Sequence, residues 1–400
     1  MKIAGIVAEY NPFHSGHGHQ IARTRAELGR DCAVVAVMSG NWVQQGDCAI
    51  ADKWTRARLA LQGGADLVVE LPTVWAAATA ESFADGAVGI LNACGVVDVL
   101  SFGGERVDLE GMRRVAACLD SAEYQQQVSC LVNEGMTFAA CRQQAVEHLL
   151  GEELGQLLAT PNNNLGVEYI RTLNRLDSAI HPMVVLREGA AHNSVGQNQT
   201  HISATQIRAQ LLAGHWDEAE PYLTAEGRAV LEGGAAGLPS AKWIERALLA
   251  RLRTMTEQDW EQLPDCGSAE GLTRRLERAG KSCATVEEFF EQAKTKRYTH
   301  ARLKRLLLWA YLGLTAENRP DAPPYIRVLG FNQRGREVLR RMKGACSLPI
   351  ITKPAHANEL DETGRRLFEL EARCTDLYDL CFACPPAPGR EWVTDPVVLL

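Results

Sequence analysis

The chain has 400 residues, of which 46% are hydrophobic and 23% charged, with a formal net charge of −7. This composition is typical of a globular protein of two or three domains, and the negative charge argues against a protein coated in nucleic acid. No apolar run reaches the roughly 18 residues of a membrane helix, and the apolar start is too short for a signal peptide. The twelve cysteines follow no disulfide framework, so we expect reduced thiols and a cytoplasmic protein.

Short apolar strands alternate with helices over the first hundred residues. The predicted elements are, in chain order, a strand over 3–8, a helix over 17–28, a strand over 32–38, a helix over 52–61, a strand over 65–72, a helix over 79–91 and a strand over 96–102. This alternation predicts an α/β fold with a Rossmann-like parallel sheet covered on both faces. Ligands of such sheets bind beyond the carboxyl ends of the strands, where the polar segments 11–17, 39–45 and 101–105 lie. We therefore expect these three loops to meet at one crevice.

The remainder of the chain is predicted to be largely helical. The predicted segments are, in order, a mostly helical region over 109–180 with a polar stretch at 160–164 and a helix over 167–173, a strand over 183–186, a loop rich in glycine and asparagine over 189–199, a helix over 205–212, a turn at 233–237, helices to about 313, and a strand–helix–strand unit over 326–352. The C-terminal half is therefore expected to be mostly helical, with one small βαβ element.

The segment between the first strand and the first helix carries the most specific chemistry, because it holds His14 and His17 around Ser15 and Gly16. Unpaired N–H groups at a helix N-terminus favour an anion, and two imidazoles can donate to phosphate oxygens. A glycine between them lets a nucleotide approach the backbone. This His-x-Gly-His corner predicts ATP-dependent nucleotidyl transfer with His14 and His17 as the catalytic pair, the alternative being structural turn histidines. Asn11 could cap the helix or orient His14.

Residues near other predicted strand ends could complete this site. Gly103 would let adenine or ribose pack against the backbone, and Arg187 could bind phosphate or adenine. Arg208, together with Ser203 and Thr205 at a helix start, predicts a second phosphate corner. A simple N-cap would explain Ser203 without any ligand.

Metal ligands are less apparent in the sequence. Cys381 and Cys384 have metal or redox spacing, but a zinc site needs two further ligands, so we predict no bound zinc. ATP chemistry implies Mg²⁺, for which no acidic cluster identifies ligands. Glu9 could hold the ion or simply orient a loop.

Positive charge is concentrated in two stretches. Six Lys or Arg residues and no acid lie within 294–305, and six more lie within 326–343 against one Glu. An acidic protein with such stretches can bind an anionic polymer on one face, although an isolated basic run is more often solvated helix surface. Trp42 could stack on a target base or belong to the core. The residues predicted to contact RNA phosphates, with one aromatic for stacking, are Lys294, Lys296, Arg297, Tyr298, Arg302, Lys304 and Arg305.

Taken in order, these motifs resemble those of the bacterial tRNA(Met) cytidine acetate ligase family. The chain departs from the family at Gln45, where the family has Arg, and at Asn164, where an apolar residue is expected. Any phosphate or RNA contact that the family makes through that Arg is therefore not expected in this chain. The segments that carry the resemblance cover most of the chain and are 7–17, 38–46, 64–72, 101–105, 161–169, 203–208, 296–299, 325–332 and 348–353.

The resemblance implies a nucleotidyltransferase domain over 1–215 and a mostly helical tRNA-binding region over 216–400. It implies a ligase that converts ATP and acetate to acetyladenylate and pyrophosphate, and then transfers the acetyl group to the wobble cytidine of elongator tRNA(Met), forming N4-acetylcytidine. It also implies that Asn162 binds the nucleotide. The residues expected to bind ATP are Val7, Ala8, Glu9, Tyr10, Asn11, Pro12, Phe13, His14, Ser15, Gly16, His17, Gly18, His19, Gln20, Gly103, Asn162, Arg187, Ser203, Thr205 and Arg208.

Two other functions remain open from the residues alone. The first is a nucleotidyltransferase that acts on a small metabolite, which the long C-terminal half with its basic stretches disfavours. The second is a non-catalytic RNA-binding module that retains a nucleotide-binding fold, which the intact His14 and His17 disfavour.

Overall fold

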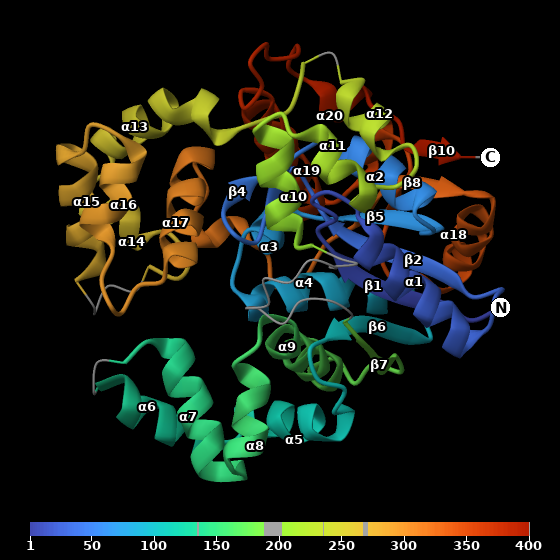
Figure 1. Cartoon of the computed structure of the whole chain (residues 1–400), viewed down its shortest axis with the longest axis horizontal. Helices are drawn as coiled ribbons and strands as arrows, with labels where there is room; N and C mark the ends of the chain where they lie inside the picture. The colour runs from blue at the N-terminus through green and yellow to red at the C-terminus, as the bar shows by residue number, and fades with distance from the viewer. Residues whose placement is uncertain (134–135, 188–201, 235, 267–270, 400) are drawn as a thin grey trace.

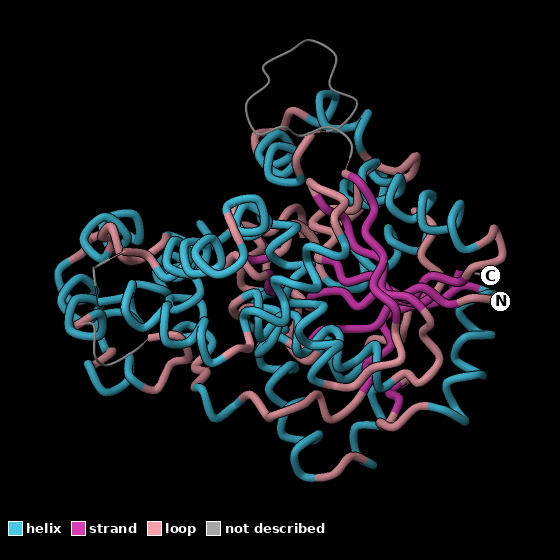
Figure 2. The backbone as a smooth tube through the Cα atoms, turned by 90° about the horizontal axis from the view of Figure 1, so that it is seen from below, coloured by secondary structure: helices cyan, strands magenta, loops and turns pink. Residues whose placement is uncertain are grey.

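A computed structural model describes residues 1–133, 136–187, 202–234, 236–266 and 271–399 (Figure 1). The loop predicted over 189–199 lies outside these residues. One twisted sheet runs through the molecule and is covered by helices, and both ends of the chain lie on the same side of it (Figure 2). This architecture is the predicted α/β class.

The main sheet has the strand order β10-β8-β5-β2-β1-β6-β7, with β9 paired to β8. All its neighbours are parallel except β5 and β8, which are antiparallel. The strands are β1 (Ile3–Ala8), β2 (Ala33–Ser39), β5 (Leu67–Leu71), β6 (Val99–Gly104), β7 (His181–Leu186), β8 (Ile326–Asn332), β9 (Ile350–Ile351) and β10 (Val397–Leu399).

The central strands form because their residues are apolar and often β-branched, which suits a sheet buried on both faces. Alternate residues of β2 belong to different cores. Val35 and Val37 pack into the larger core with Phe83, whereas Val34 packs into the smaller core with Ile21. The strands predicted from the first hundred residues are therefore confirmed.

Helices α1 (Ser15–Leu28) and α2 (Lys53–Gln62) contribute to the smaller core, and α4 (Ala80–Ala93) and α9 (Pro161–Arg175) to the larger one. From the centre of the sheet, β1, β2 and β5 follow one another toward one edge, and β6 and β7 follow one another toward the other edge. The order thus reverses between β1 and β6. In open α/β sheets such a reversal creates the crevice in which ligands bind.

Helix α9 begins at Pro161 and not at the predicted residue 167, so most of the polar stretch at 160–164 forms the start of this helix. Proline suits the first turn of a helix because it has no N–H to leave unpaired and its φ is already helical. The three following asparagines thus lie in the first turn of α9, and two of them, Asn162 and Asn164, line a cavity at the crevice.

The strand–helix–strand unit near the C-terminus is present as β8, α18 (Gln333–Ala345) and β9. Its first strand extends the main sheet by pairing antiparallel with β5, and β10 pairs with β8 in turn. The two predicted regions of the chain therefore share one sheet.

A buried ion cluster joins these regions. The ammonium group of Lys53, with no exposed surface, lies 2.7 Å from Glu70 Oε1 and 2.5 Å from Glu391 Oε2. The side-chain oxygens of Glu371, beside this cluster, accept hydrogen bonds from the backbone N–H and hydroxyl of Thr73. Because unpaired charge is costly in a protein interior, these contacts fix α2, β5 and the C-terminal helices relative to one another.

Two helical lobes flank the sheet in Figure 1. The helices along the bottom of the view are α5 (Leu109–Leu119), α6 (Ala122–Asn133), α7 (Phe138–Leu150) and α8 (Glu152–Gly155). The helices at the left, here called the basic lobe, are α13 (Glu245–Thr254), α14 (Glu257–Glu261), α15 (Leu272–Ser282), α16 (Val286–Ala293) and α17 (His300–Leu312).

Candidate active site

A cavity of about 410 Å³ opens beyond the carboxyl ends of β1 and β6, at the reversal of strand order. The residues predicted to bind ATP that line it are Val7, Ala8, Glu9, Tyr10, Asn11, His14, His17, Gln20, Gly103, Asn162, Arg187, Ser203 and Arg208. Those that do not line it are Pro12, Phe13, Ser15, Gly16, Gly18, His19 and Thr205. The loops expected to converge on one crevice therefore do so.

His14 is the N-cap of α1, with an extended backbone at φ −142°. Its Nδ1 accepts the backbone N–H of Gly16 at 3.1 Å, and Nδ1 of His17 accepts the backbone N–H of His14 at 3.2 Å. The two imidazoles thus form a capping box of the kind usually built from Ser or Thr and Glu. Because both Nδ1 atoms accept, each ring in its neutral form carries its proton on Nε2. The corner can therefore supply two Nε2–H donors to an anion.

The His17 ring lies with its centroid 3.9 Å from that of His14. Burial lowers the pKa of His17 well below its usual 6.5, and the neighbouring His14 and Arg187 lower it further. His17 is therefore neutral near pH 7, which preserves the hydrogen-bonding pattern described above.

Asn11 does not cap α1, whose N-cap is His14, so the predicted capping role is wrong. Asn11 is still a candidate for orienting His14, a role that stays a prediction. Its Oδ1 accepts the backbone N–H of Ile50 at 2.7 Å, and its carbonyl oxygen accepts a hydrogen bond from Nη1 of Arg208 at 2.7 Å. The cap position falls to His14 because the chain is extended there, three residues further on. Asn11 thus connects the histidine corner to α10 (Ala204–Leu212).

Glu9 is the one acidic residue among the described residues that line the cavity. Its Oε1 accepts the backbone N–H of Gln44 at 2.7 Å. Burial raises the pKa of Glu9 above its usual 4.5, although the hydrogen bond from Gln44 and the nearby charges of Arg208 and Arg56 oppose that rise. The hydrogen bond therefore fixes the orientation of the Glu9 side chain, and the raised pKa favours its protonated form.

A second wall of the cavity comes from the start of α9. Glu105 accepts the backbone N–H groups of Asn162 and Asn163, at 3.3 and 3.0 Å, and the side-chain amide of Asn162 at 2.5 Å. Arg187 Nη1 then donates to Asn162 Oδ1 at 3.3 Å. Burial works to raise the pKa of Glu105, but these hydrogen bonds outweigh it and hold the pKa below its usual value. Asn162 and Arg187 are therefore positioned by a carboxylate that itself lies outside the cavity lining.

Ser203 is the N-cap of α10 and forms a capping box with Gln206, so a structural role accounts for Ser203. Arg208 combines its bond to Asn11 with one from Nη2 to the hydroxyl of Thr205, at 3.1 Å. The predicted second corner thus supplies a guanidinium and a helix start to the same cavity.

Several lining residues were not predicted, and most of them are apolar. Phe102 and Tyr169 pack edge to face, with ring centroids 5.6 Å apart. A Cβ on Gly166 would lie 2.4 Å from Phe102, so only glycine lets α9 approach the sheet this closely. Asn162, Leu165 and Tyr169 are three and four residues apart, so they lie on one face of a helix. This spacing is the sequence signal that could have identified Leu165 and Tyr169 as lining residues. The unpredicted lining residues are Gln44, Ala80, Phe83, Phe102, Pro161, Asn164, Leu165, Tyr169 and Ala204.

A short hairpin, β3 (Trp42–Val43) and β4 (Asp47–Cys48), connects the cavity to the basic lobe. Gln44 lines the cavity, whereas a Cβ on Gly46 would lie 2.5 Å from the backbone nitrogen of Arg305 in α17. Trp42 is only 1% exposed and donates from Nε1 to the carbonyl of Cys374 at 3.0 Å. Of the two roles considered for Trp42, the place in the core is therefore confirmed.

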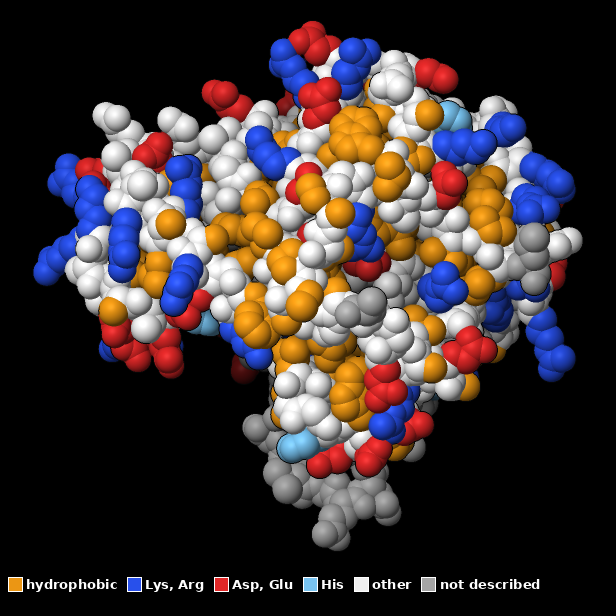
Figure 3. Space-filling view, turned by 90° about the horizontal axis from the view of Figure 1, so that it is seen from above, with side chains coloured by type: hydrophobic (Ala, Val, Ile, Leu, Met, Phe, Trp, Pro, Cys, Tyr) orange, Lys and Arg blue, Asp and Glu red, His pale blue; other side chains and the backbone are white. Residues whose placement is uncertain are grey.

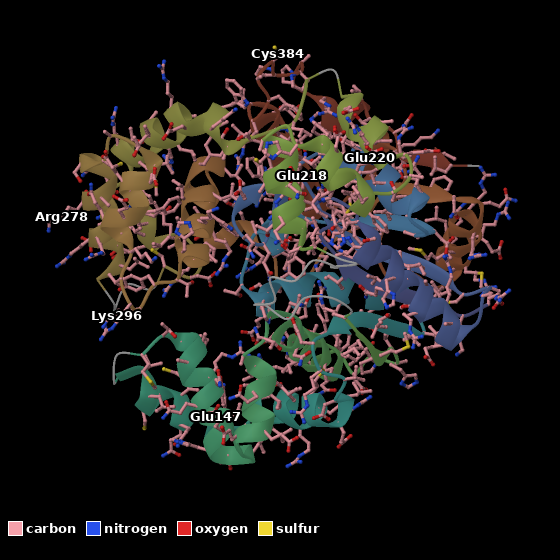
Figure 4. All side chains as sticks on the ribbon, viewed as in Figure 1. Glu147, Glu218, Glu220, Arg278, Lys296 and Cys384 are labelled. Atoms are coloured by element: carbon pink, nitrogen blue, oxygen red, sulfur yellow. The ribbon has the colours of Figure 1, made fainter. Side chains whose placement is uncertain are left out.

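The predicted RNA-contacting stretch 294–305 is divided by the fold. Lys294, Lys296 and Arg297 are exposed, and Lys296 extends from the lower tip of the basic lobe in Figure 4. Tyr298 is only 5% exposed, so its ring offers no surface for base stacking. The remaining three cations are half-buried: Arg302 donates from Nε to the carbonyl of Asp265 at 2.8 Å, Lys304 pairs with Asp47 at 3.2 Å, and Arg305 lies against the hairpin.

Across the described ranges, no group of three or more His, Cys, Asp or Glu residues is arranged to hold a metal ion. Cys381 is buried and Cys384 is exposed. In the same part of the chain, no helix combines the length and apolar character needed to cross a membrane.

Comparison with known proteins places this geometry in context. A family model described as HIGH Nucleotidyl Transferase matches residues 1–389. The tRNA(Met) cytidine acetate ligase of Thermoanaerobacter sp. (strain X514) is 35% identical over 402 residues, which cover 98% of each chain. That of Acetivibrio thermocellus is 32% identical over the full length of both chains.

Two solved structures are also similar to this chain over its full length. The apo crystal structure of Thermotoga maritima TmcAL is similar, with 32% sequence identity, a TM-score of 0.93 and complete coverage of both chains. A second structure of that protein, bound with alpha-thio ATP, has 31% identity, a TM-score of 0.92 and complete coverage.

Proposed function

We propose, from the premise that the chain belongs to the HIGH nucleotidyl transferase family and to its tRNA(Met) cytidine acetate ligases, that it joins acetate to tRNA(Met) at the expense of ATP. The enzyme converts ATP and acetate to acetyladenylate and pyrophosphate, and then transfers the acetyl group to the wobble cytidine to form N4-acetylcytidine. The observation that carries this proposal is the convergence of the histidine corner, Asn162, Arg187 and Arg208 on one cavity at the strand-order reversal.

In the first step a carboxylate oxygen of acetate attacks the α-phosphorus of ATP, and the bond to pyrophosphate breaks. The enzyme must hold both anions together and stabilise the charge on the phosphates. The N-terminus of α1 and the Nε2–H groups of His14 and His17 are suited to this task. Arg187 and Arg208 add positive charge from two other walls of the cavity.

In the second step the N4 amine attacks the acetyl carbonyl carbon, AMP leaves, and a proton must leave the amine. Glu9 is the group in the described lining best suited to accept it, because both histidines use Nδ1 as an acceptor of backbone N–H groups. Mg²⁺ would accompany ATP, and it is commonly held by one or two carboxylates together with substrate phosphates and water. Glu9 also fits that role, in which the ion would neutralise phosphate charge.

The division of the chain into functional regions is part of this proposal: residues 1–215 would bind ATP and acetate, and residues 216–400 would supply most tRNA contacts. None of the twelve cysteines, all within the described residues, forms a disulfide, which supports a reducing compartment such as the cytoplasm. The near-complete coverage of the ligase relatives also disfavours the small-metabolite alternative.

Two measurements test the function. Pyrophosphate exchange into ATP should depend on acetate, and it should proceed without RNA. Mass spectrometry of tRNA(Met) incubated with the enzyme, ATP and labelled acetate should find one labelled acetyl group, on the wobble cytidine. Absence of acetate-dependent exchange would remove the catalytic proposal, and exchange without labelled tRNA would leave an adenylating enzyme with a different acceptor.

A further inference from the structure

The basic lobe carries a groove outside the stretch that the sequence indicated. It has a volume of about 560 Å³ and is lined by Arg274, Arg275, Arg278, Ala279 and Gln292. This lining, taken over the described residues, contains three guanidinium groups and no carboxylate. Because α15 buries Leu272, Leu276 and Ala279, its arginines are left on the outer face.

Two of these arginines are held in place by their Nε atoms. Arg274 Nε donates to Glu257 Oε1 at 3.0 Å, and Arg275 Nε donates to the carbonyl of Ala293 at 3.1 Å. Their Nη groups, which form the fork that binds phosphate oxygens, have no hydrogen-bond partner among the described residues. The Arg274 side chain remains 81% exposed despite its anchor. Such pre-orientation lowers the entropy cost of binding an anion.

The groove is close along the chain to the exposed part of the predicted RNA-binding stretch, since its lining residue Gln292 lies two positions before Lys294. Ala293, whose carbonyl holds Arg275, directly precedes Lys294. Arg278 and Lys296 both extend outward from this lobe in Figure 4, and Lys and Arg side chains gather on the same lobe at the left of Figure 3. Arg274 and Arg278 are one turn apart, about 6 Å along the helix, so they can contact different phosphates.

The proposed function requires a partner that extends beyond the cavity. In Figure 1 helix α15 lies at the far edge of the basic lobe, away from β1 and α1, where the cavity opens. A small substrate in the cavity therefore has no use for this groove, whereas a folded RNA whose wobble base enters the cavity has phosphates available for it.

We propose that the α15–α16 groove binds the phosphate backbone of the tRNA at a distance from the modified base, with Arg274, Arg275 and Arg278 as its contacts. This inference rests on the proposed function, because it takes tRNA as the substrate. Lys294, Lys296 and Arg297 are also exposed, on the segment that joins α16 to α17 in the same lobe.

The test uses the full chain with all three arginines changed to Gln, and a matched control with Arg340, Arg341 and Lys343 changed to Gln. The control cations are also exposed, but lie on α18 at the opposite side of the molecule. Binding of transcribed elongator tRNA(Met) is measured at several salt concentrations. The groove variant should bind at least about tenfold more weakly at 100 mM KCl, and its plot of log K against log salt should be shallower by roughly 2, as expected when three phosphate contacts are lost.

Acetate-dependent pyrophosphate exchange without RNA should be unchanged in the groove variant, which shows that the enzyme is folded. Arg278→Gln alone, which breaks no ion pair or hydrogen bond given by the described residues, should weaken binding about threefold. Wild-type affinity and salt slope in the groove variant would overturn the proposal, as would an equal loss in the α18 control. So would binding of vesicles containing phosphatidylserine that depends on these arginines while tRNA binding does not. If the wild-type enzyme lacks exchange activity, the proposed function fails. If the groove variant shows normal exchange and binds RNA as tightly as the wild type, only the proposal about the groove fails.

Discussion

The imidazole of His17 accepts the backbone N–H of His14, with 3.2 Å between Nδ1 and the nitrogen. One side chain thereby completes the cap of α1 and fixes the proton of its own neutral ring on Nε2. Different replacements of His17 can therefore separate its effect on stability from its effect on catalysis.

His17→Asn keeps an acceptor near the position of Nδ1 but removes the Nε2–H donor, whereas His17→Ala removes both. We expect both variants to lower kcat for acetate-dependent exchange by about 10²-fold or more, because a preorganised donor to the reacting phosphate is lost. His17→Ala should also lose about 1 kcal/mol of unfolding free energy, and His17→Asn clearly less. Exchange kinetics and urea denaturation measure these effects. Wild-type exchange in His17→Asn would show that Nε2 takes no part.

Glu105→Gln should weaken ATP binding without touching the cavity. A Gln side chain has one acceptor oxygen, so it cannot satisfy both the backbone N–H groups and the amide that Glu105 satisfies at the start of α9. Unfolding free energy should fall by about 1 kcal/mol, and KM for ATP should rise severalfold as Asn162 and Arg187 lose their positions. Glu153→Gln, at an exposed carboxylate nearby, is the control. A normal KM with reduced stability would mean that Asn162 does not bind the nucleotide.

Glu371 should make the protein less stable as pH rises from about 5 to 8. Burial and the nearby Glu70 raise its pKa from 4.5 to about 8, so the folded state holds a proton that the unfolded state releases. The stability contributed by that proton is complete below the unfolded pKa and is lost as pH rises through the folded one, at up to roughly 1 kcal/mol per pH unit. Glu371→Gln is neutral throughout, so its unfolding free energy should exceed that of the wild type increasingly toward pH 8. Parallel pH profiles of the two proteins would contradict this prediction.

Gly46→Ala should disturb the junction between the cavity and the basic lobe. The new Cβ would lie 2.5 Å from a backbone nitrogen of α17, which cannot move independently, and φ at this residue is +74°. We expect a loss of about 1–3 kcal/mol and a larger fall in tRNA acetylation than in exchange. Gly237→Ala is the matched control, because Gly237 has φ +73° but no atom within 4 Å of the new Cβ. Equal losses in both variants would assign the effect to backbone conformation alone.

The sheet and the histidine corner could be predicted because their signals are local. Buried parallel strands appear as short apolar runs, and two histidines around a glycine at a helix start are typical of a phosphate-binding corner. Contacts between distant segments could not be predicted. The apolar wall at Phe102 and Tyr169 depends on how closely α9 approaches β6, and the role of Asn11 depends on Ile50 and Arg208. For the same reason, the sequence could not show that Arg302 donates to the carbonyl of Asp265 or that Lys304 pairs with Asp47 of the hairpin.

The pairing of Lys53 with Glu391, together with the antiparallel contact between β5 and β8, makes the first half of the protein dependent on residues translated much later. While the ribosome is still extending the chain, β5 has an open edge and Lys53 lacks one of its two counter-ions. The nucleotide pocket is therefore expected to form late in biosynthesis. Until it does, the nascent protein exposes a sheet edge that chaperones would need to protect, and it cannot yet consume ATP.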